Sequence, residues 1–318
     1  MRVFRGIPTN HRPVALTIGN FDGVHVGHQA MLLRLIASAR ERNLPASVMT
    51  FEPHPRELFA QTKEQVPTRL TSLREKLELL KSVGVDEVYV CHFNHTFAKT
   101  TAEQFIVDLL HKRLSVQWLL VGDDFSFGAH RQGNYEFLSH YANDLGFELH
   151  SMPSVEVDGQ RISSSLIRDV LAAGNFALAE KYLNRPYTMS GKVMHGDKIG
   201  RTIGFPTANI NIKHKRPPIT GIFAVKLWLS DSTSYLGAAS LGTRPTITDS
   251  GIYRLEVHVL DFDGNLYDQQ VKVEFFHKLR DEERYLDMET LIKQITLDVE
   301  NIRQFFAEHT EITSQQNV

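Results

Sequence analysis

Short apolar runs alternate with amphipathic segments along the first half of the chain. The runs have the length and β-rich composition of buried strands, and they lie at residues 14–18, 46–51, 87–91 and 118–121. Between the runs, apolar residues recur at helical spacing in residues 31–42, 70–83 and 105–110. This order predicts a Rossmann-like α/β domain, in which helices cover both faces of a parallel sheet. Ligands of such sheets bind beyond the carboxyl ends of the strands.

The pattern changes near residues 184–186, after a helix that we expect to start at Asn175 and end near Leu183. Only strand and turn signals follow up to residue 276, with strand-like runs at 222–229, 235–241, 255–260 and 271–276. Asp263-Gly264 predicts a hairpin turn between the last two runs. An antiparallel β-barrel is the simplest fold for these strands, because closure leaves no exposed edge.

A long amphipathic helix is predicted after the barrel, because one apolar stripe runs from Met288 to Phe306. We expect this helix to pack on the barrel and the polar residues beyond it to fray. The chain therefore divides into two predicted domains, residues 1–185 and 186–308, followed by a polar tail at residues 309–318.

Composition narrows the class of protein. The 318 residues are 42% hydrophobic and 23% charged, which is ordinary for a globular protein with a buried core. A formal charge of −2 creates no strong field toward nucleic acid or an anionic membrane, so any phosphate must be bound by local sites. The single cysteine, Cys91, excludes an internal disulfide. Without a membrane-spanning apolar run or a signal-peptide pattern, the chain is expected to be cytoplasmic.

The first candidate site is the segment GNFDGVHVGH at residues 19–28, between the first predicted strand and the first helix. Its glycine spacing fits neither a dinucleotide-binding fingerprint nor a P-loop. It brings His25 and His28 to a helix N-terminus, where free N–H groups favour a phosphate and two imidazoles can stabilise charge on an attacked phosphorus. The alternatives are two capping or surface histidines, or half of a metal site that lacks a third ligand.

A second segment, RISSSLIR at residues 161–168, places three hydroxyls at a predicted helix start. The hydroxyls of Ser163, Ser164 and Ser165, with the free amides there, suit a polyphosphate. Arg168 adds a planar donor within the first turns. The alternative is a serine N-cap on an amphipathic helix, and neither role excludes the other.

Together these segments resemble the adenylyltransferase half of bacterial FAD synthetases, which are nucleotidylyltransferases with an H-x-G-H signature. The resemblance covers nearly all of residues 1–185 and includes TFEPHPR at 50–56, residues 69–84 and VGDDFSFG at 121–128. It implies that the phosphate of FMN attacks ATP directly and that pyrophosphate leaves, with no covalent enzyme intermediate.

The resemblance also assigns roles to individual residues. His25 and His28 would stabilise the transition state at the α-phosphorus, while Asp124 and Phe125 would face FMN. The residues assigned to ATP are Gly19, Phe21, Asp22, Ser163, Ser164, Ser165 and Arg168. The departures from the family pattern are Ser126 in place of the usual Arg, Ser165 in place of Thr and Asn134 in place of Asp.

The second half carries a glycine-rich, positively biased segment at residues 191–209, GKVMHGDKIGRTIGFPTAN. Its backbone amides could wrap a phosphate chain, although the spacing does not make a Walker motif and a set of simple turns is the alternative. In the predicted strand at 255–260, Glu256 and His258 share one face. A glutamate there could act as general base toward a hydroxyl, and the alternative is a solvent-facing glutamate.

These segments resemble the riboflavin kinase module, from about Tyr187 to Phe306. The matching signatures are FPTAN at 205–209, GTRPT at 242–246 and EVHVLDF at 256–262. The resemblance implies that Glu256 activates the ribityl 5′-hydroxyl and that Thr207 and Asn209 coordinate Mg²⁺ and ATP phosphates. It assigns Gly191 and Gly200 to ATP and Arg280, in the loop at 279–282, to the flavin. The departures are Ser240 for a usual Asn and Asp268 for a usual Gly.

Two motif sets in the family's order predict a bifunctional, ATP- and Mg²⁺-dependent enzyme that makes FMN from riboflavin and FAD from FMN. The expected partners are riboflavin, FMN and ATP, without nucleic acid or membrane, and a homo-oligomer stays open. One alternative is another adenylyltransferase or a tRNA synthetase fragment, which the kinase-like half disfavours. The other is a flavin-binding regulator with inactive sites, which the intact His25, His28, Arg168, Thr207, Asn209 and Glu256 disfavour.

Overall fold

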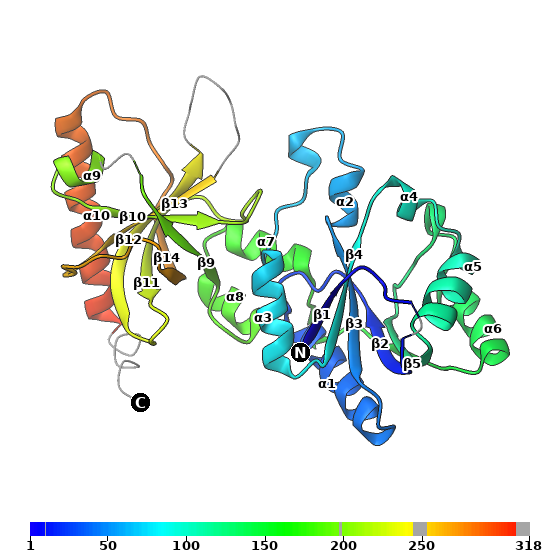
Figure 1. Cartoon of the computed structure of the whole chain (residues 1–318). Helices are drawn as coiled ribbons and strands as arrows, with labels where there is room; N and C mark the ends of the chain where they lie inside the picture. The colour runs from blue at the N-terminus through cyan, green and yellow to red at the C-terminus, as the bar shows by residue number, and fades with distance from the viewer. Residues whose placement is uncertain (10, 197–198, 244–252, 310–318) are drawn as a thin grey trace. The chain divides into compact units, whose positions relative to one another are not determined.

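The computed structural model describes residues 1–9, 11–196, 199–243 and 253–309 (Figure 1). The chain forms two compact units. The first combines Met1–Pro67 with Leu73–Ser164, and the second combines Thr68–Ser72 with the chain from Ser165 onward. The domain boundaries predicted from the sequence stay a prediction. None of the described helices is long and apolar enough to cross a membrane.

The first unit contains a six-stranded sheet in which all neighbours are parallel, in the order β1-β4-β3-β2-β5-β6. The strands are β1 (Arg2–Arg5), β2 (Val14–Ile18), β3 (Ala46–Glu52), β4 (Glu87–His92), β5 (Val116–Gly122) and β6 (Glu148–Met152). The predicted parallel sheet and its four inner strands are confirmed. The sequence pattern did not reveal β1 and β6, because these edge strands are mostly exposed or half-buried and carry no apolar run.

Two hydrophobic clusters hold helices on opposite faces of this sheet. Leu32 and Leu35 of α1 pack with Leu80 of α3 in one cluster, and Ile106 of η2 packs with Leu138 of α6 in the other. The helices are α1 (Val26–Glu41), α2 (Pro55–Leu58), η1 (Lys63–Gln65), α3 (Leu73–Val83), α4 (His95–Ala98), α5 (Ala102–Gln104), η2 (Phe105–Arg113, a π-helix), η3 (Ala129–Arg131) and α6 (Tyr135–Leu145). A short hairpin joins β7 (Glu156–Val157) to β8 (Gln160–Arg161).

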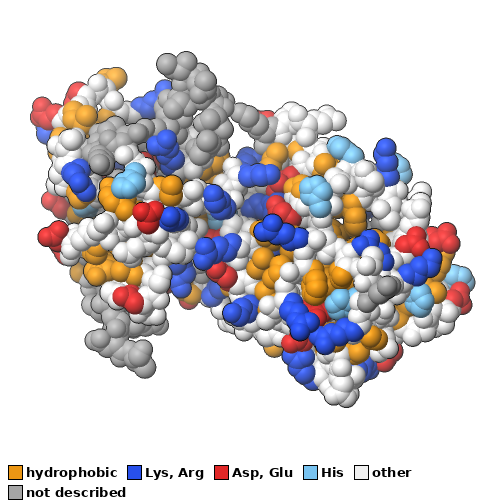
Figure 2. Space-filling view, viewed as in Figure 1, with side chains coloured by type: hydrophobic (Ala, Val, Ile, Leu, Met, Phe, Trp, Pro, Cys, Tyr) orange, Lys and Arg blue, Asp and Glu red, His pale blue; other side chains and the backbone are white. Residues whose placement is uncertain are grey.

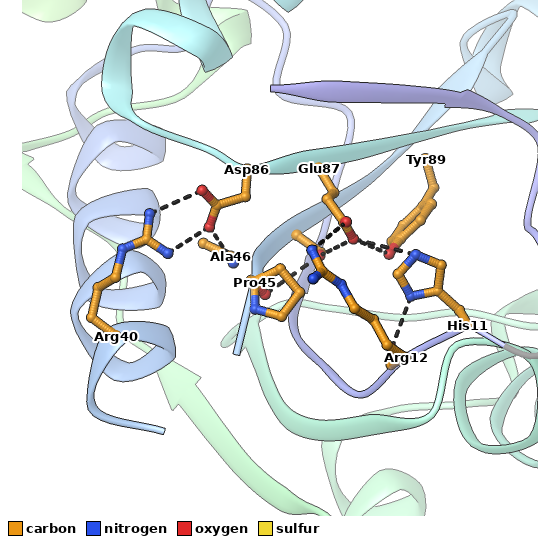
Figure 3. Close-up of polar contacts among 9 residues, drawn as sticks. His11, Arg12, Arg40, Pro45, Ala46, Asp86, Glu87 and Tyr89 are labelled. Carbon is orange, nitrogen blue, oxygen red and sulfur yellow. Dashed lines mark hydrogen bonds and ion pairs between the residues drawn. The ribbon is translucent and has the colours of Figure 1, made fainter. Parts of the chain in front are cut away.

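The amino ends of the strands are tied together by charged side chains (Figure 3). Glu87, at the start of β4, is 1% exposed, and its carboxylate accepts hydrogen bonds from Arg12, Tyr89 and Ser47. The neighbouring Asp86 accepts two from Arg40, at 2.6 and 3.0 Å. The protein itself therefore supplies several donors to each of these carboxylates.

The second unit is built on a closed antiparallel barrel in the order β10-β13-β12-β11-β14-β9. The strands are β9 (Thr188–Met194), β10 (Thr207–Ile212), β11 (Gly221–Trp228), β12 (Ser234–Thr243), β13 (Tyr253–Val259) and β14 (Gln270–Arg280). The predicted barrel is confirmed, but the hairpin predicted at Asp263-Gly264 is wrong. β13 and β14 are not neighbours, because β13 pairs with β10 and β12 while β14 pairs with β9 and β11. Barrel closure overrides the local turn signal.

Among the described residues of this unit, the helices beside the barrel are α7 (Ser164–Ala172), α8 (Phe176–Leu183), α9 (Ile199–Thr202) and α10 (Met288–Glu308). Asn175 caps α8 as predicted, by accepting from the Leu178 N–H at 3.1 Å. The predicted packing of the last helix is confirmed, since Ile302 and Phe306 are buried against Ala224 and Leu260. Met288, at the other end of that stripe, is 50% exposed. The short helix α9 was not predicted.

Candidate active sites

The first candidate site is the loop that joins β2 to α1, at the carboxyl end of the parallel strands. Gly19 donates its N–H to the Met49 carbonyl at 3.0 Å, and Thr50 Oγ1 donates to the Asn20 carbonyl at 3.2 Å, so β3 holds the loop. Phe21, Gly23 and Val24 all have left-handed backbone angles. A β-branched residue such as Val24 is strained there, and such strain persists where the surrounding structure enforces it.

The loop brings the two predicted histidines into contact. His25 is the N-cap of α1, its ring accepts from the His28 N–H at 3.4 Å, and the two rings stack with centroids 3.6 Å apart. A Cβ on Gly27 would come 3.2 Å from His25 Cε1, so glycine permits this close approach. Figure 2 shows basic, acidic and hydrophobic side chains interspersed on one face of the molecule.

The electrostatics of His28 favour a neutral ring. Desolvation lowers the pKa of His28 well below its usual value, and the positive charges of His25 and Lys76 lower it further. Within the described part of the chain, His28 Nδ1 and Asn20 Oδ1 are buried without a hydrogen-bond partner. Buried polar atoms are rarely left unpaired in native proteins, so these two atoms mark a place where a ligand or water completes the structure.

The serine segment reaches the same loop. Ser164, the first residue of α7, donates its hydroxyl to the carbonyl of Asp22 at 3.0 Å across 142 positions of sequence. Asp22 is 2% exposed, and Ser163 directly precedes the helix. The structure thus brings the first serines to the histidine loop. Arg168 lies one turn further along α7.

The residues predicted to face FMN follow β5. Asp124 is 76% exposed and pairs with Arg161 at 3.0 Å, and Phe125 stacks on Phe127 with centroids 5.4 Å apart. Asn134, where the family usually has Asp, is the N-cap of α6 and accepts from the Phe137 N–H at 2.9 Å. An aspartate would make the same cap, so this departure keeps the local structure. The FMN contacts themselves stay predictions.

Two features of this edge were missed from the sequence. An aromatic cluster lies at the carboxyl ends of β3 and β4, with Phe59 60% exposed, and it is formed by Phe51, Phe59, Phe93 and Phe97. Its signal was an aromatic residue at the end of one strand-like run and another shortly after the next. The second feature is Lys76, which is 1% exposed and lies with its Nζ 3.4 Å from Thr50 Oγ1. Its signal was a lysine at an apolar position of the helical repeat.

The second candidate site lies on one face of the barrel. Glu256 of β13 stands opposite Asn209 of β10 on one side and Ser240 of β12 on the other, and His258 stands opposite Thr207. Leu255 and Val257 are fully buried, so the alternating residues lie on the other face of the strand. Strand pairing therefore places Thr207, Asn209 and Glu256, which were predicted to serve the kinase reaction, next to one another.

The glycine-rich segment lies close to Thr207 and Asn209. A Cβ on Gly196 would come 2.8 Å from Asn209 Oδ1, and one on Gly200 would come 3.5 Å from Thr207 Oγ1. His258 Nδ1 lies 2.9 Å from the carbonyl oxygen of Pro206. The backbone is thus held against the two residues predicted to coordinate Mg²⁺.

Their hydroxyl and amide oxygens are hard donors, and two protein ligands suit a magnesium ion that arrives with phosphates. Within the described residues, no group of three or more His, Cys, Asp or Glu could hold a metal by itself.

Two other predicted residues have clear structural partners. Gly191 is buried in β9 and pairs with Ile212 of β10. A Cβ on Gly191 would come 2.6 Å from the Asn211 carbonyl oxygen. Along β10, this pair lies three residues from Asn209. Arg280 makes a two-pronged ion pair with the buried Asp298 of α10, at 2.9 and 2.6 Å. The contacts predicted for these residues with ATP and flavin stay predictions.

The departures in this unit also have local explanations. Asp268 has a left-handed φ of 65° and pairs with Lys192 at 2.7 Å, so the position favours the glycine that is usual there, and aspartate tolerates it. Ser240 donates to Glu282 at 2.8 Å. Of the signature at 242–246, residues 244–246 lie outside the described residues.

Family models match both parts of the chain. A model described as FAD synthetase matches residues 7–166, and one described as riboflavin kinase matches residues 183–306. The bifunctional riboflavin kinase/FMN adenylyltransferases of Haemophilus influenzae and Escherichia coli K12 are each 45% identical over 96% of this chain and over 99% and 98% of their own lengths. That of Pseudomonas fluorescens is 44% identical over 94% of this chain and 96% of its own.

One solved structure covers nearly the whole chain. It is a crystal structure described as a macrolide-efflux protein from Streptococcus pneumoniae, with a TM-score of 0.77 and 30% identity over 95% of this chain and 98% of that one. The efflux description concerns that protein. Because the match covers 95% of the chain, it includes residues of both units.

Proposed function

This chain belongs to the family of bifunctional riboflavin kinases/FMN adenylyltransferases, and from this premise we propose which of its residues carry each reaction. It is an ATP-dependent transferase that phosphorylates riboflavin to FMN and transfers AMP from ATP to FMN, giving FAD and pyrophosphate. The division of labour follows the two family matches, with adenylyl transfer in residues 7–166 and phosphorylation in residues 183–306.

For adenylyl transfer, we propose that His25 and His28 bind the α-phosphate of ATP. An oxygen of the FMN phosphate attacks the α-phosphorus, the bond to the bridging oxygen breaks, and pyrophosphate leaves. Because the lowered pKa keeps His28 neutral near pH 7, its ring has one N–H to donate to the charge that builds on the α-phosphate oxygens. The unpaired buried atoms of Asn20 and His28 support this position for the nucleotide.

The remaining residues of this site bind the ends of the two substrates. Ser163, Ser164, Ser165 and Arg168 would hold the β- and γ-phosphates, supported by the bond from Ser164 to the loop. Gly19, Phe21 and Asp22 would shape the nucleotide pocket. Asp124 and Phe125 would face FMN, and the exposed aromatic cluster that includes Phe59 offers flat apolar surface of the kind that an isoalloxazine ring stacks on.

For phosphorylation, we propose that Glu256 takes the proton of the ribityl 5′-hydroxyl as that oxygen attacks the γ-phosphorus of ATP. Thr207 and Asn209 would hold Mg²⁺, which when bound neutralises phosphate charge. The backbone around Gly196 and Gly200, close to these two side chains, would cradle the phosphates together with Gly191, and Arg280 would lie on the flavin side. Pairing of Glu256 directly opposite Asn209 is the observation that carries this assignment.

Product analysis tests the proposal. Purified protein with Mg²⁺, ATP and riboflavin should yield FMN and then FAD on chromatography, and chelation of the metal should stop phosphorylation. Glu256→Ala should stop FMN formation, by about 10²–10⁴-fold for loss of a general base, while supplied FMN is still converted to FAD. Wild-type phosphorylation by Glu256→Ala would refute the role of Glu256.

We also propose that the protein works in the cytoplasm, where riboflavin, ATP and reducing conditions occur together. Its one cysteine, Cys91, is buried and can form no disulfide within the chain, which fits a reducing compartment. Fractionation of cells that make the protein tests the proposal, and FAD-forming activity recovered outside the cytoplasmic fraction would contradict it.

A further inference from the structure

A buried lysine lies on the sheet-facing side of α3. Lys76 is 1% exposed and follows Leu73 by three residues, on the face that also carries Leu77 and Leu80. Lysine is almost never fully buried unless it is paired, because removing an ammonium from water costs free energy. Packing alone would favour an apolar residue at this position, so the polar contacts of the ammonium must account for it.

The contacts of Lys76 lead to the histidine loop. Its Nζ donates to Thr50 Oγ1 at 3.4 Å, and the same hydroxyl donates to the Asn20 carbonyl at 3.2 Å. Thr50 is fully buried, so its hydroxyl accepts one bond and donates the other away from solvent. A chain of two hydrogen bonds therefore runs from α3, through β3, to the backbone just ahead of His25 and His28.

The charge of Lys76 also acts on His28. Desolvation is the main cause of the lowered pKa of His28, and the positive charges of His25 and Lys76 lower it further. His25 is the N-cap of α1 and stacks on the ring of His28, whereas Lys76 belongs to a different helix, α3. Asp22, in the loop before His25, is a buried acid. Lys76 is thus placed to influence both the backbone that carries the histidines and the proton on one of them.

We propose that Lys76 is a positioning residue for adenylyl transfer. Through Thr50 it fixes the loop at Asn20, so that both imidazoles meet the triphosphate in one orientation, and its buried charge favours the anionic substrate. The inference rests on the adenylyl-transfer site proposed above. Nothing in this role requires Lys76 to touch the nucleotide.

The test compares four variants of the full chain. Lys76→Met keeps the length of the side chain without the charge, Lys76→Arg keeps the charge, and Thr50→Val removes the bridging hydroxyl. Lys81→Met, at an exposed lysine of the same helix, is the matched control. Each is assayed for FAD formation from FMN and ATP, with riboflavin phosphorylation by the same preparation as a report on intact protein.

Lys76→Met should lower kcat for FAD formation about 10- to 100-fold, because a misplaced catalytic group costs rate more than affinity, with little change in KM for FMN. Thr50→Val should lower kcat in the same direction, Lys76→Arg should recover part of the loss, and Lys81→Met should match the wild type. The acid limb of kcat/KM should move to higher pH in Lys76→Met but not in Thr50→Val, because only the first removes the charge that opposes protonation of His28.

Wild-type kcat in Lys76→Met would overturn the inference. If Lys76→Met loses both activities through misfolding, Thr50→Val decides, since normal FAD formation by that variant would show that the bridge does not matter. His28→Ala in the same assay separates the two proposals. FAD formation by His28→Ala would refute the site itself, whereas its loss beside a normal Lys76→Met would refute only the role of Lys76.

Discussion

The two edges of the parallel sheet treat buried polar groups in opposite ways. At the amino edge, the carboxylate of Glu87 is buried and accepts bonds from Arg12, Tyr89 and Ser47. At the carboxyl edge, His28 Nδ1 and Asn20 Oδ1 are buried without a partner among the described residues. The protein itself supplies partners to Glu87, whereas the histidine loop leaves two polar atoms for a ligand or water.

Both edges contain residues with a left-handed φ, such as Asn43 and Ser115 at the amino edge, but only the loop after β2 places a β-branched residue there among the described residues. The loop after β2 holds Phe21 and Val24 in left-handed conformations, which for a β-branched residue costs free energy that the rest of the fold must supply. The amino edge instead uses ion pairs to join β4 to the segment before β2 and to α1. The ion pairs of the amino edge therefore join elements of the fold, whereas the loop after β2 is where we propose that the nucleotide binds.

The largest expected effect comes from removing an unpaired ring at the carboxyl edge and is a loss of FAD formation. His28→Ala should lower FAD formation about 10²–10³-fold, the loss typical of one donor to developing charge, while FMN still accumulates from riboflavin. Chromatography of the products from riboflavin and ATP measures both outcomes at once. FAD at the wild-type rate would show that the unpaired ring does not serve the reaction.

The next largest effect comes from changing the buried carboxylate of the amino edge and is a loss of stability. Glu87→Gln should lower the free energy of unfolding by about 1–3 kcal/mol, because a buried network loses its charged acceptor while Arg12 keeps access to water. The midpoint of urea unfolding measures the change. FAD formation per folded molecule should stay at the wild-type rate, and a selective loss of that activity would contradict the separation of the two edges.

A smaller effect depends on pH. Burial alone would raise the pKa of Asp86, but hydrogen bonds from Arg40 and from the Ala46 N–H outweigh it and leave the pKa below its ordinary value. As the pH falls, Asp86 therefore stays ionised in the folded state at pH values where the same residue in the unfolded chain already binds a proton. The resulting stability is fully present above about pH 4, the usual range of an aspartate, and is lost as the pH falls further.

Asp86→Asn tests this dependence. The thermal unfolding midpoint of the variant should lie below that of the wild type at neutral pH, and the difference should shrink as the pH is lowered past about 4. Because Asp86 is partly exposed, the difference should be modest. A gap that widens in acid would contradict the assignment.

The smallest effect concerns a departure from the family pattern near the carboxyl edge. Asn134 caps α6 with its side-chain oxygen, and aspartate is an equally good cap. Asn134→Asp should therefore change the free energy of unfolding by no more than about 0.5 kcal/mol. Asn134→Ala is the matched comparison and should cost about 1 kcal/mol, because it leaves the Phe137 N–H without its acceptor.

Several features followed from the sequence alone. Inner strands of a parallel sheet are buried on both faces and so form continuous apolar runs, which is why β2 and β3 could be located. The cap at Asn175 is a local signal and is confirmed, and the strands predicted after residue 184 form the predicted barrel. The two histidines and the serine segment were recognised as candidates because hydrogen-bond donors at predicted helix starts suit a phosphate.

Tertiary structure decided the rest, because the deciding contacts join distant parts of the chain. The turn signal at Asp263-Gly264 was local, yet closure of the barrel gave β13 and β14 other partners. Burial of Lys76 and its bond to Thr50 depend on how α3 lies on the sheet, which periodicity does not specify. Likewise, the sequence supplied Ser164 and Asp22 as separate motifs, and only folding placed the hydroxyl of one on the carbonyl of the other. The local pattern of apolar and polar side chains determines where helices and strands form. Packing between distant parts of the chain determines which side chains of a site come together.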